Sequence, residues 1–238
     1  MMTQTGSTRP LFAISIAAVA VIGMVALGLW QLERMRQKEE RLTSIAQKQQ
    51  NGTVALAALD PVSEDIRDYS VTFQGVPHPE MTMLLDNQIE KSQVGFDVIV
   101  PVQTAQGWLL VNWGWVAANK SRMTLPTTQI EANANNFSGI IMVPENNPLV
   151  RETAAPNATF PAVIQQLDLN FIGELTGQTL LPFVIQLNAP ASASFVRTWA
   201  PVVMPPEKHF AYAIQWFALA IAAASVTYFV VFARNKKV

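Results

Sequence analysis

Two long stretches of the chain carry no charged side chain, and they constrain the fold more than any other feature. The first runs from Leu11 to Leu32 and the second from Phe210 to Ala233. Because an α-helix rises about 1.5 Å per residue, each stretch would span roughly 33–36 Å, enough to cross a hydrocarbon core of about 30 Å. The sequence therefore predicts two transmembrane helices, with both termini on one side of the membrane.

A cleaved signal peptide is the alternative for the first stretch, since Ala26-x-Gly28 resembles a cleavage site. The apolar run is longer than a signal core of about 7–15 residues, and Arg9 is the only basic residue before it. We therefore favour a membrane anchor. The C-terminal "ARNKKV" is typical of a cytoplasmic flank. Basic residues also follow the first helix, but long loops cross membranes largely regardless of charge.

These features divide the chain into five segments. The polar stretch after the first helix has no Gly or Pro and is rich in helix formers, which predicts a helical stalk. Asn51-Gly52 and Asp60-Pro61 then favour a break. We expect a transmembrane helix at 11–32, a stalk at 33–50, a β-rich periplasmic domain at 51–209, a transmembrane helix at 210–233 and a cytoplasmic tail at 234–238.

The central segment alternates apolar and polar residues, as half-buried strands do. In "YSVTFQGV", for example, Tyr69, Val71 and Phe73 alternate with polar residues. One helix is expected near 168–176, capped by Asp168 and followed by Gly177. The predicted fold class is membrane α+β: a two-helix transmembrane hairpin enclosing a mainly antiparallel, barrel-like β domain with little helix. Strands are expected at 69–76, 81–88, 95–104, 107–116, 137–146, 180–188 and 194–203.

Composition excludes several classes of function. The chain has no cysteine, so it has no disulfide, iron–sulfur cluster or thiol nucleophile. Its 16 basic and 17 acidic residues give a net charge of −1, which does not suggest a nucleic-acid partner. Only two histidines are present, and no hydrolase or phosphate-binding motif accompanies them. We therefore expect no enzymatic activity.

His209 is the sharpest candidate for a binding residue. Pro205-Pro206 suit the first turn of the second helix, which places His209 at the level of the lipid headgroups. Tyr212, Ala213 and Trp216 follow it at helical spacing on one face. An imidazole is a common axial ligand of haem iron, and haem propionates would favour the helix N-terminus and the adjacent Lys208. This pattern is consistent with a haem site.

Two other interpretations of these residue types stay open. Aromatic residues collect at membrane interfaces without any ligand, so the stripe below His209 is also typical of an aromatic belt. His78, Met81 and Met83 form a soft ligand set that could hold Cu(I), although the methionines could equally line one face of a strand. Ala218 and Ala222 are small residues four apart, which would allow the two helices to touch.

Motifs in order along the chain resemble the surfeit locus protein 1 (Surf/Shy) family of cytochrome c oxidase assembly factors. The first is "LGLWQLERMRQK", similar to the Gly-x-Trp-Gln-x-x-Arg element of the family, and the last is "KHFAYAIQWFALA", similar to its His-x-x-Tyr-Ala-x-x-Trp-Phe signature. Between them lie "LLDNQ", "VGFDVIVPV" and "LLVNWGWV". One departure is Trp113, where the family usually has Arg before Gly-Trp-Val.

The resemblance implies a non-catalytic assembly factor in the bacterial inner membrane, with two spans and a periplasmic domain. It implies that the protein binds haem a as cargo and assists its insertion into oxidase subunit I, with haem a synthase as a further partner. His209 would be the iron ligand, walled by Tyr212 and Trp216. Trp30 would close the other side of the pocket, and Arg34 would join Lys208 as a propionate partner. A haem-free scaffold that holds oxidase subunits is the alternative.

Overall fold

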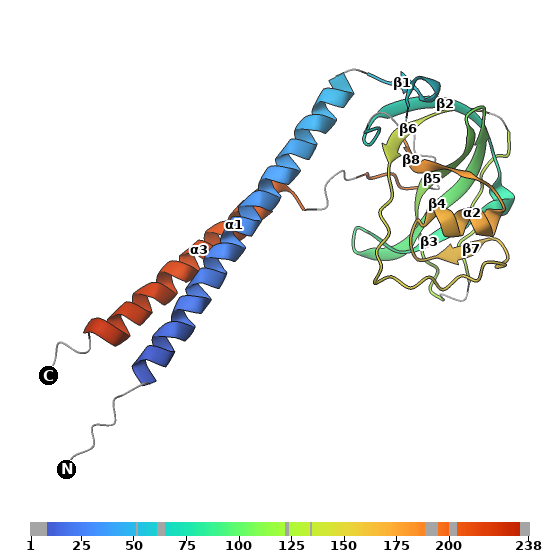
Figure 1. Cartoon of the computed structure of the whole chain (residues 1–238). Coiled ribbons are helices and arrows are strands. Elements are labelled where there is room, and N and C mark those ends of the chain that lie inside the picture. The colour runs from blue at the N-terminus through green and yellow to red at the C-terminus, as the bar shows by residue number, and fades with distance from the viewer. Residues whose placement is uncertain are drawn as a thin grey trace, which may run out of the picture. The chain divides into compact units, whose positions relative to one another are not determined.

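The computed structural model describes residues 9–50, 52–60, 65–121, 124–133, 135–188, 195–199 and 204–233 (Figure 1). The predicted basic tail at 234–238 lies outside the described residues. The chain forms two compact units, one of Met1–Ser44 with Pro201–Val238 and the other of Ile45–Ala200. We describe the helical unit first and the β unit second.

The helical unit contains two long helices. α1 (Arg9–Gln50) includes both the first apolar stretch and the polar stretch that follows it. α3 (Pro206–Tyr228) begins with Pro206 in its first turn and ends in a π-helical turn, η3 (Phe229–Ala233). Both helices are long and apolar enough to cross a membrane.

α1 and α3 pack along a seam with the repeat of a coiled coil. In each helix the less exposed residues recur at alternating intervals of three and four, which is the spacing that keeps one face of a helix against a partner. Between Ile14 and Met35 of α1 and along α3, Leu32 and Phe217 are the less exposed residues that do not fit this spacing. The seam positions are Ile14, Ala17, Val21, Met24, Gly28, Gln31 and Met35 on α1, and Pro206, His209, Ala213, Trp216, Ala220, Ala223 and Thr227 on α3.

Small residues allow the two helices to approach closely, but they are not the expected ones. Ala218 and Ala222 are exposed, so the prediction that they form the contact is wrong. Ala213 and Ala220 are buried instead, at 1% and 4% exposure. A Cβ atom on Gly28 would lie 2.6 Å from the Phe217 ring, so the glycine makes room for that ring. The seam therefore follows the heptad spacing and not the four-residue spacing of the alanines.

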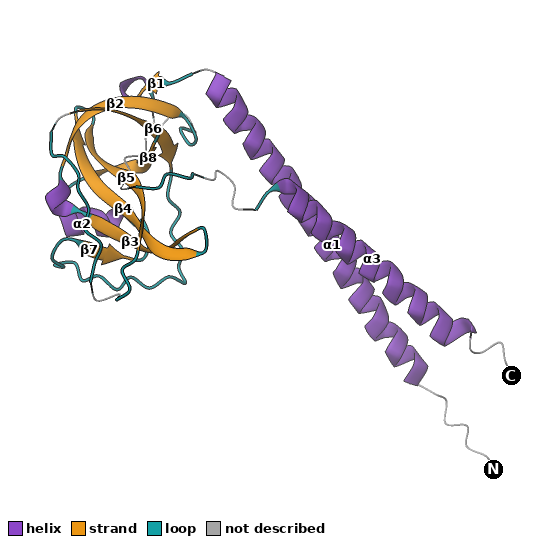
Figure 2. Cartoon of the chain, turned by 180° about the vertical axis from the view of Figure 1, so that it is seen from behind, coloured by secondary structure: helices purple, strands orange, loops and turns teal. Residues whose placement is uncertain are grey.

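The β unit is a mixed sheet closed into a five-stranded barrel (Figure 2). β2 pairs with β6 along one edge and with β4 along the other, which closes the order β2-β6-β8-β5-β4. β5 and β8 are parallel, while the other barrel neighbours are antiparallel. The strands are β1 (Val54–Ala55), β2 (Ser70–Pro77), β3 (Met83–Glu90), β4 (Gln93–Thr104), β5 (Gly107–Ala117), β6 (Asn135–Met142), β7 (Ala162–Ile164) and β8 (Leu180–Leu187).

The connectivity of the barrel is a Greek key. β6 returns after a long connection to lie beside β2, which gives the spatial order β6-β2-β4-β5. β3 extends the sheet from β4, and β7 pairs in parallel with β3. A five-stranded Greek-key barrel is also the architecture of the OB-fold. The predicted barrel-like, mainly antiparallel domain is confirmed, with parallel pairs added to it.

Two hydrophobic cores lie on opposite faces of the central strands. Val100, Val102 and Val111 are buried in the larger core, and the neighbouring Ile99 and Leu110 are buried in the smaller one. The smaller core also contains residues of α2 (Leu169–Thr176), namely Ile172 and Leu175, and of β7. Burial on both faces explains why β4 and β5 are almost continuously apolar in the sequence.

Local signals predicted several elements well. The Asp168 side chain accepts hydrogen bonds from the backbone N–H groups of Asn170 and Phe171, and Gly177 ends α2 in the left-handed conformation with φ 68°. The prediction of a strand at 194–203 is wrong over residues 195–199, the part of this range before residue 200 that the structure describes. There Val196 forms only an isolated bridge with Trp115. The bridge lies beyond Asn112, where the pairing of β5 with β8 ends, and it does not extend into a ladder over residues 195–199.

Trp113, the departure from the family pattern, occupies the barrel core. Its side chain is 7% exposed and meets the Phe137 ring edge-on, with 5.7 Å between ring centroids. It lies opposite a register shift in the pairing of β4 with β5. Its carbonyl oxygen accepts a hydrogen bond of 2.7 Å from Arg197 Nε. The position is therefore apolar in this chain, and a guanidinium reaches its backbone from another segment.

Candidate functional site

His209 lies in the first turn of α3 and faces the helix seam. Pro206 begins the helix, and the Lys208 N–H bonds to the carbonyl of Pro205. His209 is one of the α3 seam positions, and it is only 8% exposed. The heptad spacing therefore turns the imidazole inward, toward α1 and away from the acyl chains.

The imidazole has one polar partner and one unpartnered nitrogen. Its Nδ1 lies 2.8 Å from Oε1 of Gln31, a seam residue of α1. Its Nε2 is buried and has no hydrogen-bond partner. A buried nitrogen without a partner costs free energy, typically about 1–3 kcal/mol. An atom held in this way is a candidate for a ligand bond.

The other predicted residues of α3 lie around this histidine in different settings. Trp216 is half-buried and occupies the same seam two turns further along the helix. Tyr212 is 45% exposed, and Lys208 is also exposed. The seam therefore contains His209 and Trp216, while Tyr212 and Lys208 lie outside it.

Trp30 and Arg34 form a pair of their own on α1. The Arg34 guanidinium carbon lies 5.5 Å from the centroid of the Trp30 ring, within the range of a cation–π contact. Arg34 also donates a hydrogen bond of 3.1 Å to Gln37. Trp30 is 51% exposed, so the paired side chains are accessible from outside the helix seam.

Gln31 is the site residue that the sequence analysis did not single out. It follows Trp30 in the Gly-x-Trp-Gln-x-x-Arg element, but its partner is 178 residues away in the sequence. A signal for its importance was present nonetheless. Gln31 is a polar residue at a seam position, and buried polar groups on such faces require a partner.

The other histidine, His78, lies in the β unit, and its Nε2 is likewise buried without a hydrogen-bond partner. His78 Nδ1 lies 2.7 Å from a carboxylate oxygen of Glu80, and the ring packs against Trp108 at 4.7 Å between centroids. Met81 lies in the short η2 helix (Pro79–Met81), whereas Met83 is fully buried in the smaller hydrophobic core. The Met83 thioether therefore serves packing, as the strand interpretation predicted.

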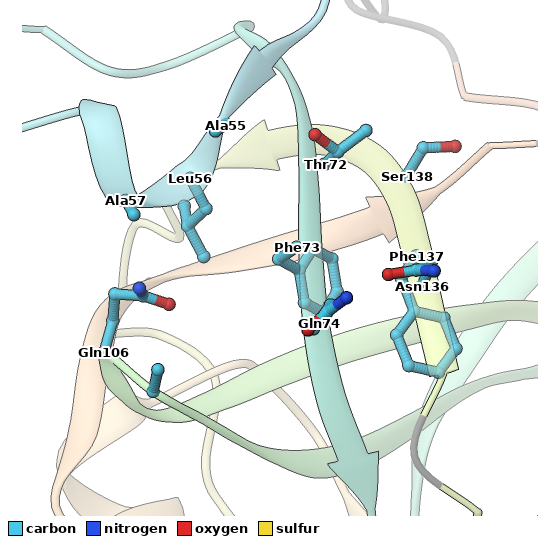
Figure 3. Close-up of a pocket in the computed structure, with 11 residues that line it drawn as sticks. Ala55, Leu56, Ala57, Thr72, Phe73, Gln74, Gln106, Asn136, Phe137 and Ser138 are labelled. Atoms are coloured by element: carbon cyan, nitrogen blue, oxygen red, sulfur yellow. The ribbon is translucent and has the colours of Figure 1, made fainter.

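One cavity of the β unit lies along β2 and has a volume of about 640 Å³. Figure 3 shows the amide side chains of Gln74, Gln106 and Asn136 on its wall, beside the stacked rings of Phe73 and Phe137. None of its lining residues is titratable. The cavity therefore offers neutral hydrogen bonds and apolar contact, but no acid–base or metal chemistry.

A smaller cavity of about 200 Å³ contains Asp97, Glu90 and the rings of Trp115 and Trp199. Burial raises the pKa of Asp97, and the nearby Glu90 adds to this effect. A hydrogen bond of 2.8 Å from the Asn112 amide to the carboxylate acts in the opposite direction. Among the residues that the structure describes, no three His, Asp or Glu side chains are grouped so that they could hold a metal ion.

The fold and the site together define a class: a barrel protein carried by a two-helix hairpin, with one buried imidazole on the hairpin seam. The sequence matches the SURF1 family over residues 18–221, and the chain belongs to this family. Membership implies a membrane protein with a role in cytochrome oxidase assembly, in a family whose assembly factors are generally non-catalytic. A search of curated proteins found no match.

Proposed function

We propose that this protein is an assembly factor for haem-copper (cytochrome c) oxidase that binds haem a and assists its insertion into subunit I. Family membership supports the assembly role. Haem binding is supported by one observation, which is that the buried and unpartnered Nε2 of His209 lies on the seam between two apolar helices, whereas that of His78 lies in the β unit. A neutral imidazole nitrogen is a common axial ligand of haem iron, so the donor fits the cargo.

The remaining side chains near His209 suit a lipophilic and anionic porphyrin. Trp216, Tyr212 and Trp30 provide aromatic surface for the ring. Lys208 and Arg34 provide exposed cations for the propionates. Because His209 Nε2 is enclosed, haem would reach it only when α1 and α3 separate at this end or the imidazole turns.

The proposed setting is the bacterial inner membrane, with two spans and the barrel in the periplasm. The positive residues after α3 favour a cytoplasmic C-terminus. In this arrangement the first turn of α3 lies where the bilayer meets the periplasm. Haem a would pass from haem a synthase to this site and then to subunit I, without any covalent change in the protein.

The test is a pyridine haemochrome assay on detergent-purified protein. We expect wild type to carry haem with a visible Soret band and His209→Ala to lose it while the circular dichroism spectrum is unchanged. His78→Ala is the matched control, since it removes the only other histidine. If His209→Ala retains the full haem content, the ligand assignment is wrong.

A haem-free scaffold is the second candidate, and the bond of 2.8 Å between His209 and Gln31 favours it, because such a contact between two helices needs no ligand. In that case the bond to Gln31 would only hold the helices together, and exposed Tyr212 and Trp30 would be interfacial residues. Co-purification of subunit I with His209→Ala, at the wild-type level and with both proteins free of haem, would support the scaffold. We do not propose copper delivery, because Met83 is part of a core.

A further inference from the structure

The bond between Gln31 and His209 determines which nitrogen of the imidazole is free. The partner atom on Gln31 is Oε1, at 2.8 Å from His209 Nδ1. A carbonyl oxygen can only accept a hydrogen bond, so Nδ1 must carry the proton. In the neutral ring the lone pair then belongs to Nε2, which is the buried atom without a partner.

The bond between Gln31 and His209 lies inside the seam of the two helices. Gln31 lies on the α1 seam three residues after Gly28, the seam position next to it, where the helices approach closely. On the opposite helix His209 is 92% buried, since its exposure is 8%. A polar pair inside an apolar seam fixes the register of two helices, and it also fixes the orientation of both side chains.

The chemistry of the partner also sets the strength of the ligand. Histidine ligands of metals usually donate their second N–H to a carboxylate, a carbonyl or water, and a carboxylate raises the basicity of the ring. An amide oxygen orients the ring in the same way without a negative charge. A histidine held by glutamine is therefore a weaker donor than one held by glutamate, which suits a group that must be released.

We infer that Gln31 is a positioning residue that holds His209 in the Nδ1–H tautomer, so that Nε2 is the ligating atom and the bound haem can be released. This inference rests on the proposed function. Gln31 itself does not contact the cargo. Its effect passes through the imidazole, so it alters the electronic state of the ligand as well as its position.

The first test uses haem-free protein and needs no cargo. Histidine labelled with ¹⁵N gives ring signals from only two residues, and His78→Gln removes one set. In the neutral ring of His209 we expect a protonated Nδ1 and a bare Nε2, which the two ¹⁵N shifts distinguish. In Gln31→Leu, which keeps the seam apolar, we expect this form to be lost. A Nε2–H ring in wild type, or an unchanged tautomer in Gln31→Leu, would overturn the inference.

The second test uses haem-loaded protein and measures the midpoint potential and the haem affinity. Gln31→Leu should weaken binding by about 10–100-fold, as removal of a supporting hydrogen bond typically does. Gln31→Glu should lower the midpoint potential and slow haem release, because the carboxylate makes the imidazole a stronger donor. A purely structural role predicts equal effects of both variants and an unchanged potential, which would overturn the inference.

The two tests separate this inference from the proposed function. If the haem-free spectra are as expected but wild type binds no haem, the proposed function is wrong and the ligand role of Nε2 is wrong with it. If wild type binds haem through His209 but Gln31→Leu changes neither tautomer nor potential, the proposed function stands and only the role of Gln31 is wrong.

Discussion

One side chain of the barrel, Asp97, lowers the free energy of unfolding by an amount that depends on pH. Asp97 lies in a cavity beside Glu90, and burial raises its pKa above the ordinary value of 3.8. Above that pH the unfolded chain releases the proton before the folded chain does. The free energy of unfolding must therefore fall as the pH rises from 3.8 through the raised pKa of Asp97.

Asp97→Asn should remove this dependence. The amide keeps an oxygen that can accept the hydrogen bond from Asn112, while the charge is absent. We expect the variant to gain stability over wild type as the pH rises from about 4 to 7, by about 1.4 kcal/mol for each tenfold change in the ionisation constant. Urea denaturation at several pH values measures this, with the exposed Glu131→Gln as the control. A constant difference across the pH range would contradict the prediction.

At this scale the sequence predicted the site only in part. His209 was identified because it stands at the start of an apolar helix, which is a local signal. The partnership with Gln31 depends on how two helices align across 178 residues, and no local pattern contains that alignment. The sequence analysis placed Tyr212 on the same helix face as His209 and did not predict that Tyr212 lies outside the seam. Residues three apart share a broad helix face, but only the heptad positions face the partner.

At the scale of the elements, the seam between α1 and α3 defines which residues of the two helices face each other. The seam positions of α1 and α3 run in opposite directions from the pair Gln31–His209, which aligns Val21 with Ala220. Apolar surface alone does not drive helices together in lipid, so close packing and the polar pair hold the seam. The alignment is therefore open to a direct test in a chain that contains no cysteine.

Val21→Cys with Ala220→Cys should form an intramolecular cross-link in membranes on treatment with a short bifunctional thiol reagent. Ala20→Cys with Leu219→Cys, one residue earlier on each helix and exposed, should not. The reason is that a step of one residue rotates a side chain by about 100° around a helix. A shift in gel mobility, reversed by cleaving the reagent, measures the reaction. Equal yields for both pairs would contradict the seam.

Strand prediction succeeded where the period was clear and failed where pairing decided the outcome. The alternation around Val71 and Phe73 predicted β2, and Asp168 with Gly177 predicted α2. β1 and β7 have two and three residues, too few to show a period. The segment around Val196 has a strand-like sequence, but it pairs with β5 only at Trp115, beyond the stretch of β5 that pairs with β8.

At the scale of the whole molecule, the two units have separate sources of stability. Both hydrophobic cores consist of residues between Leu56 and Phe195 and lie inside the β unit. Among the described residues of the helical unit, the contacts that hold the helices together are those of the seam. The barrel should therefore be stable without its membrane anchors.

A fragment of residues 45–200 should fold alone. We expect a soluble protein with the circular dichroism of a β-rich domain and a single cooperative unfolding transition, because its apolar cores are complete within the fragment. Circular dichroism and denaturant titration measure this. Val111→Asp, which places a charge in the larger core, is the control that should abolish folding. A fragment that stays unfolded would show that the helices are needed for the barrel.

The placement of β8 between β5 and β6 governs the order in which this protein can be completed during its synthesis. The ring of strands cannot close until the ribosome has passed residue 187, and pairings so distant in sequence form slowly. α3 emerges later still, whereas Gln31 enters the bilayer near the beginning of translation. A chain that ends before α3 would thus lack His209, and the bond between His209 and Gln31 could form only after most of the chain has been made.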